Sequence, residues 1–285
     1  MRMRRYMICV AAWLLAAGAA YSQTAPALLV PGDAETLSLG MTQKIPADYG
    51  FLDADITGGL WAPGSASNTY LGADVGFKLT PDLTLRMDGR YFKDAPYEIA
   101  SGQGAVSGTY VPSDLFFSVG GSYRIGGRFS LGLDARLISS SIAPAAKATG
   151  FCADVHASYG TEKYTAMLSV RNLGPGLDYG GGASALPSLA TVAGAVRPAD
   201  ALKVCLEADY LFSGALMAGL GLEYCIADIA FLRAGYHYGD AAKALASYAS
   251  LGLGATFSGF SVDLAFLTAS ETLGNSLIFG LGYSF

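Results

Sequence analysis

The chain has 285 residues, of which 52% are hydrophobic and 14% charged, with a formal net charge of −5. An acidic chain without any basic run argues against nucleic-acid binding. After the first 22 residues no apolar run is long enough for a membrane helix, and no repeat or linker divides the rest, so we expect one domain. A positive mean hydropathy spread over alternating segments is typical of a membrane β-barrel.

Residues 1–22 have the pattern of a cleavable signal peptide. Three arginines among the first five residues precede an apolar run from 7 to 20, and Ala20 and Ser22 are the small residues of a cleavage site. We expect the mature chain to begin at Gln23. A membrane anchor is the rival interpretation, but the run is short for a bilayer. Cleavage would leave 15 basic and 23 acidic residues, a net charge of −8.

Residues 23–50 contain three prolines and three glycines and lack the alternation of the residues that follow. This N-terminal segment could fill the interior of a barrel as a plug, or it could hang in the periplasm. The pattern leaves both positions open. A fourteen-stranded barrel is wide enough that something should fill it.

From residue 51 onward, apolar residues alternate with small or polar ones, the period of a β-strand. Fourteen such segments can be counted. They lie near 51–61, 69–80, 83–93, 114–125, 128–140, 149–160, 163–173, 188–198, 201–212, 215–226, 229–239, 247–258, 260–270 and 276–285. An even number agrees with a barrel whose two ends lie on the same side of the membrane.

The connections between these segments alternate in length. Six are tight, and five are longer, at 94–113, 141–148, 174–187, 240–246 and 271–275. Only the connection at 213–214 breaks this alternation, because it is short at the end where the other connections are long. Outer-membrane barrels keep short turns in the periplasm and long loops outside. The sequence therefore predicts an all-β, antiparallel transmembrane barrel over residues 51–285, located in the cell outer membrane.

The last ten residues, SLIFGLGYSF, alternate strictly and end on an aromatic residue. Such an ending resembles the C-terminal signature of barrels inserted by the outer-membrane assembly machinery. We therefore expect Tyr283 and Phe285 to act as an assembly signal, with the lipid bilayer and that machinery as partners.

Charged residues provide the candidate site. When the apolar face of each strand is assigned to lipid, sixteen charged residues, eight basic and eight acidic, face the lumen. A charge on the lipid face costs roughly 2–4 kcal/mol, enough to set the register of a strand. A balanced set predicts hydrogen-bonded ion pairs in a narrow or occluded interior, because an ion-selective pore usually carries a ring of one sign. The sixteen are Asp74, Lys78, Arg86, Asp88, Arg90, Arg124, Asp134, Arg136, Asp154, Arg171, Lys203, Glu207, Asp209, Glu223, Arg233 and Asp263.

Two histidines, His156 and His237, face the same side as these charges. A hydrolase with a histidine and a nearby carboxylate is conceivable, but neither residue belongs to a catalytic motif, so we assign both to the lumen charge network. Metal-binding spacings such as His-x-x-x-His or Cys-x-x-Cys are absent from the sequence. We expect no enzyme activity and no cofactor.

Three cysteines remain after the signal peptide, Cys152, Cys205 and Cys225, all at lumen-facing positions. Cys205 and Cys225 could come opposite each other on adjacent strands. An odd number and the strict geometry of a disulfide favour buried free thiols instead.

Several stretches together resemble the PorV/PorQ family of outer-membrane proteins, which is similar in fold to the fatty acid transporter FadL. They are 33–42 (DAETLSLGMT), 85–92 (LRMDGRYF), 138–143 (ISSSIA), 151–159 (FCADVHASY), 170–179 (VRNLGPGLDY) and 186–198 (LPSLATVAGAVRP). The resemblance implies a fourteen-stranded barrel from a Bacteroidetes-like bacterium, associated with type IX protein secretion. The chain departs from the family at 51–56 (FLDADI), where relatives usually carry Asn-Pro-Ala, and at Thr42, where glycine is common.

Two functions follow as hypotheses. The first, which the resemblance implies, is a non-enzymatic secretion component that binds secretion proteins and cargo through loops 94–113 and 174–187 and presents cargo at the cell surface. The alternative is a FadL-like transporter of hydrophobic small molecules, which needs an apolar pocket in the lumen and a lateral opening. Sixteen lumen charges disfavour such a pocket, although residues 23–50 could create one.

Overall fold

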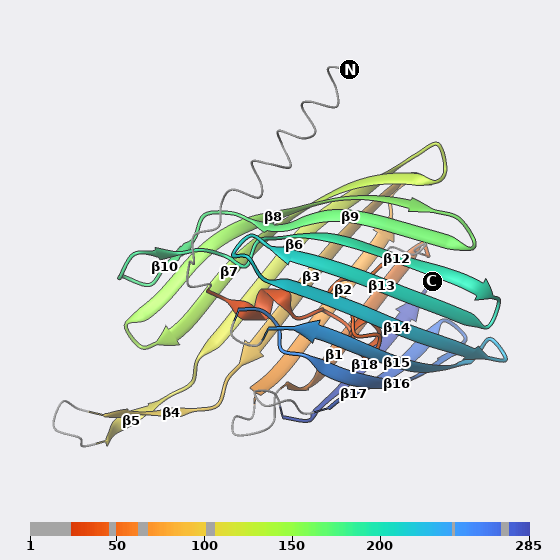
Figure 1. The fold of residues 1–285 in the computed structure, drawn as a ribbon. Helices are drawn as coiled ribbons and strands as arrows, with labels where there is room; N and C mark the ends of the chain where they lie inside the picture. Colours follow the sequence, from red (N-terminus) through yellow and green to blue (C-terminus); the bar gives the residue numbers. More distant parts are fainter. Residues whose placement is uncertain (1–23, 46–49, 62–67, 101–105, 241–242, 269–273) are drawn as a thin grey trace, which may run out of the picture.

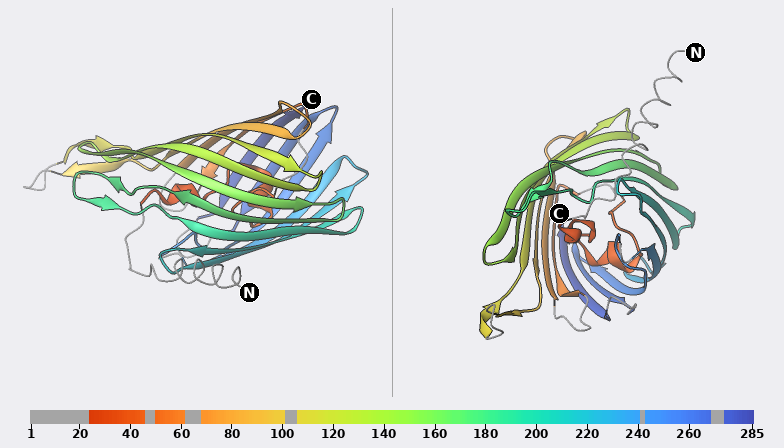
Figure 2. Two further views of the ribbon diagram at one scale, coloured as in Figure 1. Left: turned by 90° about the horizontal axis from the view of Figure 1, so that it is seen from above. Right: turned by 60° about the vertical axis from the view of Figure 1, so that its left-hand side comes forward.

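The computed structural model describes residues 24–45, 50–61, 68–100, 106–240, 243–268 and 274–285. These residues form a closed antiparallel β-barrel with a short helical segment inside it (Figure 1 and Figure 2). The expected signal peptide lies outside the described residues. Among the described residues, no helix is long and apolar enough to cross a membrane.

The barrel consists of fourteen strands, and each pairs with its neighbours in antiparallel fashion. β1 pairs with both β2 and β18, so the first and last strands close the ring. The all-β, fourteen-stranded architecture expected from alternation is therefore confirmed. The strands are β1 (Leu52–Trp61), β2 (Asn68–Lys78), β3 (Leu83–Lys93), β6 (Ser113–Ile125), β7 (Phe129–Ala143), β8 (Ala146–Gly160), β9 (Tyr164–Leu173), β12 (Leu189–Ala199), β13 (Leu202–Leu211), β14 (Leu216–Ile226), β15 (Ala230–Gly239), β16 (Tyr248–Phe257), β17 (Phe260–Leu267) and β18 (Ser276–Ser284).

Among the described residues, one expected loop is part of the barrel strands instead. Residues 141–148 were expected to form a longer loop, but β7 and β8 continue through them, with Ser141 opposite Lys147 and Ala143 opposite Ala146. Small serine and alanine side chains fit a strand pair as readily as a loop, so local composition could not separate the two. Two loops carry small hairpins of their own, β4 (Tyr97–Ala100) with β5 (Val106–Tyr110) and β10 (Leu177–Asp178) with β11 (Ala183–Ser184).

The outer surface of the barrel is apolar. Large hydrophobic side chains point outward from every strand of the barrel, including Leu137, Leu206 and Leu251, which are 64%, 58% and 61% exposed. Exposed aromatic residues such as Tyr164 and Phe260 lie near the tight turns, as in the aromatic girdles of outer-membrane barrels. A bilayer is the environment that covers such a surface.

Both ends of the barrel can be named from the connections. The turn end, which carries the tight turns, is the periplasmic end by the rule for outer-membrane barrels, and the loop end is the extracellular one. The hairpin β4–β5 projects from the loop end (Figure 1). Phe285 lies at the turn end, where its backbone N–H donates to the carbonyl of Leu52 over 2.8 Å.

Residues 24–45, here called the plug, lie in the lumen (Figure 2). The plug contains a 3-10 turn, η1 (Pro26–Leu29), and a short helix, α2 (Ala34–Ser38). Asp33 caps α2, because its carboxylate accepts hydrogen bonds from the backbone N–H and the hydroxyl of Thr36. Of the two positions left open by the sequence, the structure shows the lumen for the described part of the N-terminal segment.

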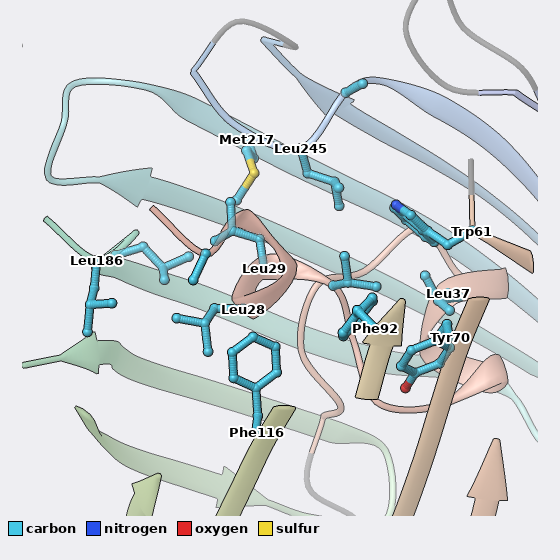
Figure 3. Close-up of a cluster of buried hydrophobic side chains, with 14 of the residues drawn as sticks. Leu28, Leu29, Leu37, Trp61, Tyr70, Phe92, Phe116, Leu186, Met217 and Leu245 are labelled. Carbon is cyan, nitrogen blue, oxygen red and sulfur yellow. The ribbon is translucent and has the colours of Figure 1, made fainter. Parts of the chain in front are cut away.

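The hydrophobic core is inside the barrel at the loop end (Figure 3). Many strand residues that point inward there are apolar, and they pack against leucines of the plug. We call this cluster the apolar cap. Its large members include Leu28, Leu29, Leu37, Trp61, Tyr70, Phe92, Phe116, Leu186, Met217 and Leu245.

Candidate functional site

The plug rests on inward-facing glycines of β14, β15 and β16. A Cβ atom added at Gly235 would lie 2.4 Å from the carbonyl carbon of Leu39 and 2.5 Å from the nitrogen of Gly40. At Gly219 it would lie 2.6 Å from the carbonyl oxygen of Gly40, and at Gly252 2.4 Å from Cβ of Ser38. Only glycine allows backbone to approach backbone this closely. The glycine content of these strands therefore has a structural use, which is to receive the plug.

One plug residue, Thr42, is bonded to the wall through all its polar atoms. Its backbone N–H donates to Oε1 of Glu207 over 2.7 Å, and its hydroxyl donates to Oδ2 of Asp209 over 3.1 Å. Arg171 donates to the backbone carbonyl of Thr42 over 3.1 Å and to its hydroxyl oxygen over 2.7 Å. Arg171 also pairs with Asp209 at 3.2 Å. Three buried charged residues on β9 and β13 thus fix the end of the plug.

A second group of charges holds helix α2. Glu35 pairs with Lys203 at 3.1 Å, and Lys203 is 3.6 Å from Glu223. Arg233 joins Glu223, at 2.6 Å, to Asp263. Burial alone would raise the pKa of Glu35, but the positive charges of Lys203, Arg233 and Lys44 outweigh it and lower that pKa to about 2.

The opposite wall carries a third group. Arg86 pairs with Asp134 at 3.0 Å, and Nδ1 of His156 lies 3.5 Å from the same carboxylate. Arg136 pairs with Asp154 at 3.0 Å and also donates to Ser118 and Asn172.

Arg90 belongs to this wall as well. It lies 3.3 Å from Asp88 and donates to the backbone carbonyl of Val30 over 2.7 Å. The plug is therefore bonded to β3 as well as to β9 and β13.

The residues proposed from the sequence as a lumen charge network all lie on inward-facing strand positions, but in separate places. Most belong to the three groups above, while Arg124 lies apart, at the turn end. His237 stacks on Tyr248, with ring centroids 5.1 Å apart, and its Nδ1 lies 3.3 Å from the carbonyl oxygen of Gly40. Both histidines therefore contact the wall or the plug, as members of the packing.

Sequence reasoning missed the plug side of these contacts. Glu35 was not singled out, and Thr42 was noted only as a departure from the family, although Asp33 and Glu35 form a helix-start pattern that could have marked α2. Asn172 was also missed; it has a positive φ of 58° and donates its backbone N–H to Asp154. The three described cysteines are free, which excludes a bridge between Cys205 and Cys225; Cys152 and Cys205 are buried thiols as expected, whereas Cys225 is only half-buried.

The rest of the lumen is polar and partly open. A cavity of about 120 Å³ lies between the plug and the wall formed by β2 to β9, lined by Asp74, Arg86, Arg136 and other polar residues. A wider vestibule of about 880 Å³ opens at the turn end. No group of three metal-ligating side chains occurs in the part of the chain that the structure describes. The lumen thus combines an apolar cap at the loop end with polar space below it.

The fold is similar to that of several solved barrel structures. No protein-family model matches the chain, and no curated protein matches it. Among solved structures, the Ralstonia pickettii toluene transporter TbuX is 11% identical with a TM-score of 0.64, over 90% of this chain and 99% of TbuX. The CymD monoaromatic hydrocarbon channel is 11% identical with a TM-score of 0.58, over 94% of both chains. The deltaS2 mutant of the TodX monoaromatic hydrocarbon channel is 15% identical with a TM-score of 0.55, over 94% of this chain and 96% of TodX.

The chain is an outer-membrane β-barrel. At these identities the likeness shows a shared fold, and it confirms the FadL-like architecture and the outer-membrane location expected from the sequence. Nothing in the comparisons supports the PorV/PorQ family specifically. The type IX secretion role and its protein partners, like the assembly signal at Tyr283 and Phe285, stay predictions.

Proposed function

We propose that this barrel is a channel for small hydrophobic molecules, held closed by its own plug. The observation that carries the proposal is the apolar cap. Tyr70 and Phe92, with ring centroids 4.8 Å apart, and Phe116, 6.1 Å from Phe92, line the lumen together with Leu28 and Leu29 of the plug. The likeness in fold to TbuX, CymD and TodX, which are named for toluene and monoaromatic hydrocarbons, agrees with this substrate class.

The apolar cap and the lumen charges lie at different depths, so the charges do not exclude a binding site for a hydrophobic molecule. The sixteen charged positions occupy the middle and the turn end, whereas the large inward side chains of the apolar cap lie at the loop end. A hydrophobic molecule entering from outside would meet apolar side chains, and its binding would be favoured by about 25 cal/mol for each Å² of apolar surface removed from water. It would take the place of Leu28 and Leu29 when the plug moves.

The exit lies in the wall, because the polar space below the cap disfavours an apolar molecule. β9 ends at Leu173, opposite Ala153 of β8, and β12 begins at Leu189. Residues 146–152 of β8 therefore have no ladder partner on that edge, where segment 174–188 packs against β8; the segment also accepts a backbone hydrogen bond at Ser188 from the N–H of Phe212. Leu177 of this segment is fully buried and would lie 2.5 Å from a Cβ atom at Gly150. Moving this segment breaks fewer backbone hydrogen bonds than opening a ladder.

The wall segment and the plug are bonded to each other. The backbone N–H of Thr24 donates to the carbonyl of Ala185 over 3.0 Å, and the hydroxyls of Thr24 and Tyr179 are 3.0 Å apart. Displacement of the plug would therefore also loosen segment 174–188. This coupling connects entry through the cap with exit through the wall.

The test compares two solutes in cells that make this protein and in cells that make an unrelated outer-membrane barrel at equal amount. We expect faster uptake of the neutral fluorescent aromatic N-phenyl-1-naphthylamine, and no gain for a disaccharide. A Leu177→Ala variant, which weakens the wall segment, should speed the aromatic further. Uptake of the disaccharide without uptake of the aromatic would contradict the proposal.

A further inference from the structure

The vestibule at the turn end is lined on one side by basic residues. Its lining includes Arg124, Arg128, Lys163, Arg197 and Lys203, of which Lys203 is paired with Glu35 and Glu223, and one acidic residue, Glu162. These residues come from the ends of β6, β12 and β13 and from the turns that follow β6 and β8. The charge here is one-sided, unlike the balance expected for the lumen as a whole.

Backbone hydrogen bonds bring these residues together. The N–H of Arg197 donates to the carbonyl of Lys163 over 2.9 Å, and the N–H of Gly160 donates to the carbonyl of Arg128 over 2.8 Å. The basic side chains therefore lie along one continuous stretch of wall, from β6 to β13, and face the same space.

Three of the basic residues are exposed and lie outside the ion pairs of the barrel. Arg128, Lys163 and Arg197 are exposed, and within the described ranges none of them forms an ion pair. Deeper in the lumen the arginines Arg136, Arg171 and Arg233 are each paired with a carboxylate. Unpaired cations that converge on one cavity create a positive potential there.

The electrostatic potential differs between the two sides of the turn end. On the other side of the barrel, Asp53 and Asp55 line a separate recess of about 300 Å³ between β1 and β17–β18. Negative charge on that side and positive charge on the β6–β13 side would draw an anion toward the vestibule. A volume of about 880 Å³ is also in the range of small-molecule pockets.

We propose that the vestibule binds a small soluble anion that carries two or more negative charges, through phosphate or carboxylate groups held by Arg128, Lys163 and Arg197. Arginine and lysine donate charge-assisted hydrogen bonds to such groups, and arginine can do so through two nitrogens at once. The site is distinct from the apolar cap, and it does not depend on the transport of hydrophobic molecules.

The test measures binding of inorganic pyrophosphate and of citrate to the full-length protein in non-ionic detergent at low salt, by calorimetry. The variant Arg128→Gln/Lys163→Gln/Arg197→Gln should bind about tenfold more weakly, since each exposed ion contact contributes little by itself. The matched control, Lys93→Gln/Lys147→Gln/Lys243→Gln, removes three exposed basic residues near the loop end and should bind as the wild type does. Circular dichroism would verify that both variants keep the barrel.

Three outcomes would overturn the inference. They are absence of binding by the wild type, equal binding by the wild type and the vestibule variant, or an equal loss in the control variant. Loss of pyrophosphate binding in nanodiscs that contain phosphatidylglycerol, compared with phosphatidylcholine, would overturn the assignment to a soluble anion in favour of lipid headgroups. Weakening of the binding at higher salt is expected, because exposed charges are screened.

Discussion

Arg171 joins the barrel wall to the plug. It is buried, it pairs with Asp209, and it donates two hydrogen bonds to Thr42. Removing one partner of a buried ion pair leaves the other charge without compensation, which costs more than the pair itself contributes.

The first prediction therefore concerns Arg171→Gln. This variant should lose about 3–5 kcal/mol of unfolding free energy, measured by urea titration in detergent micelles. The matched control is Arg128→Gln, in which an exposed arginine of the vestibule is replaced and the free energy should change by roughly 0.5 kcal/mol or less. Equal effects of the two substitutions would show that the Thr42 contacts do not hold the plug.

The second prediction concerns Gly235→Ala. A methyl group there would meet the backbone of Leu39 and Gly40, and backbone cannot rotate away as a side chain can. In Gly235→Ala the plug should be displaced, so that uptake of the neutral aromatic probe rises. The barrel itself should stay folded, which is checked by its migration on an SDS gel without heating. Gly89→Ala is the control, because nothing lies within 4 Å of its added Cβ. Unchanged uptake in Gly235→Ala would contradict the role of the glycines.

At the scale of elements, α2 depends on the barrel for its existence. A helix of five residues cannot persist in water, because nucleation is not repaid by so few hydrogen bonds. The Asp33 cap and the pair between Glu35 and Lys203 supply the contacts that it lacks. Its stability is therefore linked to the ionisation of Glu35.

The third prediction is a pH dependence with a defined sign. The pKa of Glu35 is lowered from 4.5 to about 2 in the folded protein, so its contribution is complete above about pH 4.5 and is lost as the pH falls toward 2. The difference in urea stability between the wild type and Glu35→Gln should therefore be largest at pH 6 and shrink at pH 2.5. Glu98→Gln, on the exposed hairpin β4–β5, removes a carboxylate that does not touch the plug. A constant difference across this range would refute the linkage.

For the whole molecule, the bilayer decides which side chains are tolerated outside. Leu206 lies in the middle of β13 and is 58% exposed on the apolar surface. Its sequence neighbours Cys205 and Glu207 point into the lumen and are buried. The two faces of one strand thus meet lipid and plug.

The fourth prediction tests this surface. Leu206→Arg should lower the stability of the barrel refolded into lipid vesicles by roughly 2–4 kcal/mol, because the arginine would face hydrocarbon. Leu206→Val keeps an apolar side chain and serves as the control. A barrel that accepts the arginine without loss would show that this face of β13 does not contact acyl chains.

The sequence determined the number of strands, their approximate limits and the face of each that meets lipid. These features are local, because alternation with period two and the cost of a charge in hydrocarbon act on each strand separately. The same reasoning put Arg90 and Glu207 on inward positions. It could not separate a loop from a strand pair at residues 141–148, where small side chains suit both.

The tertiary structure alone decided what fills the lumen. The contacts that hold the plug join residues far apart in the chain, such as Thr42 with Glu207 and Glu35 with Lys203, which are separated by 165 and 168 residues. The apolar cap likewise forms only when the ring closes and brings the loop ends of the strands together. No local pattern encodes such pairings, because they depend on the diameter of the barrel and on where the plug enters it.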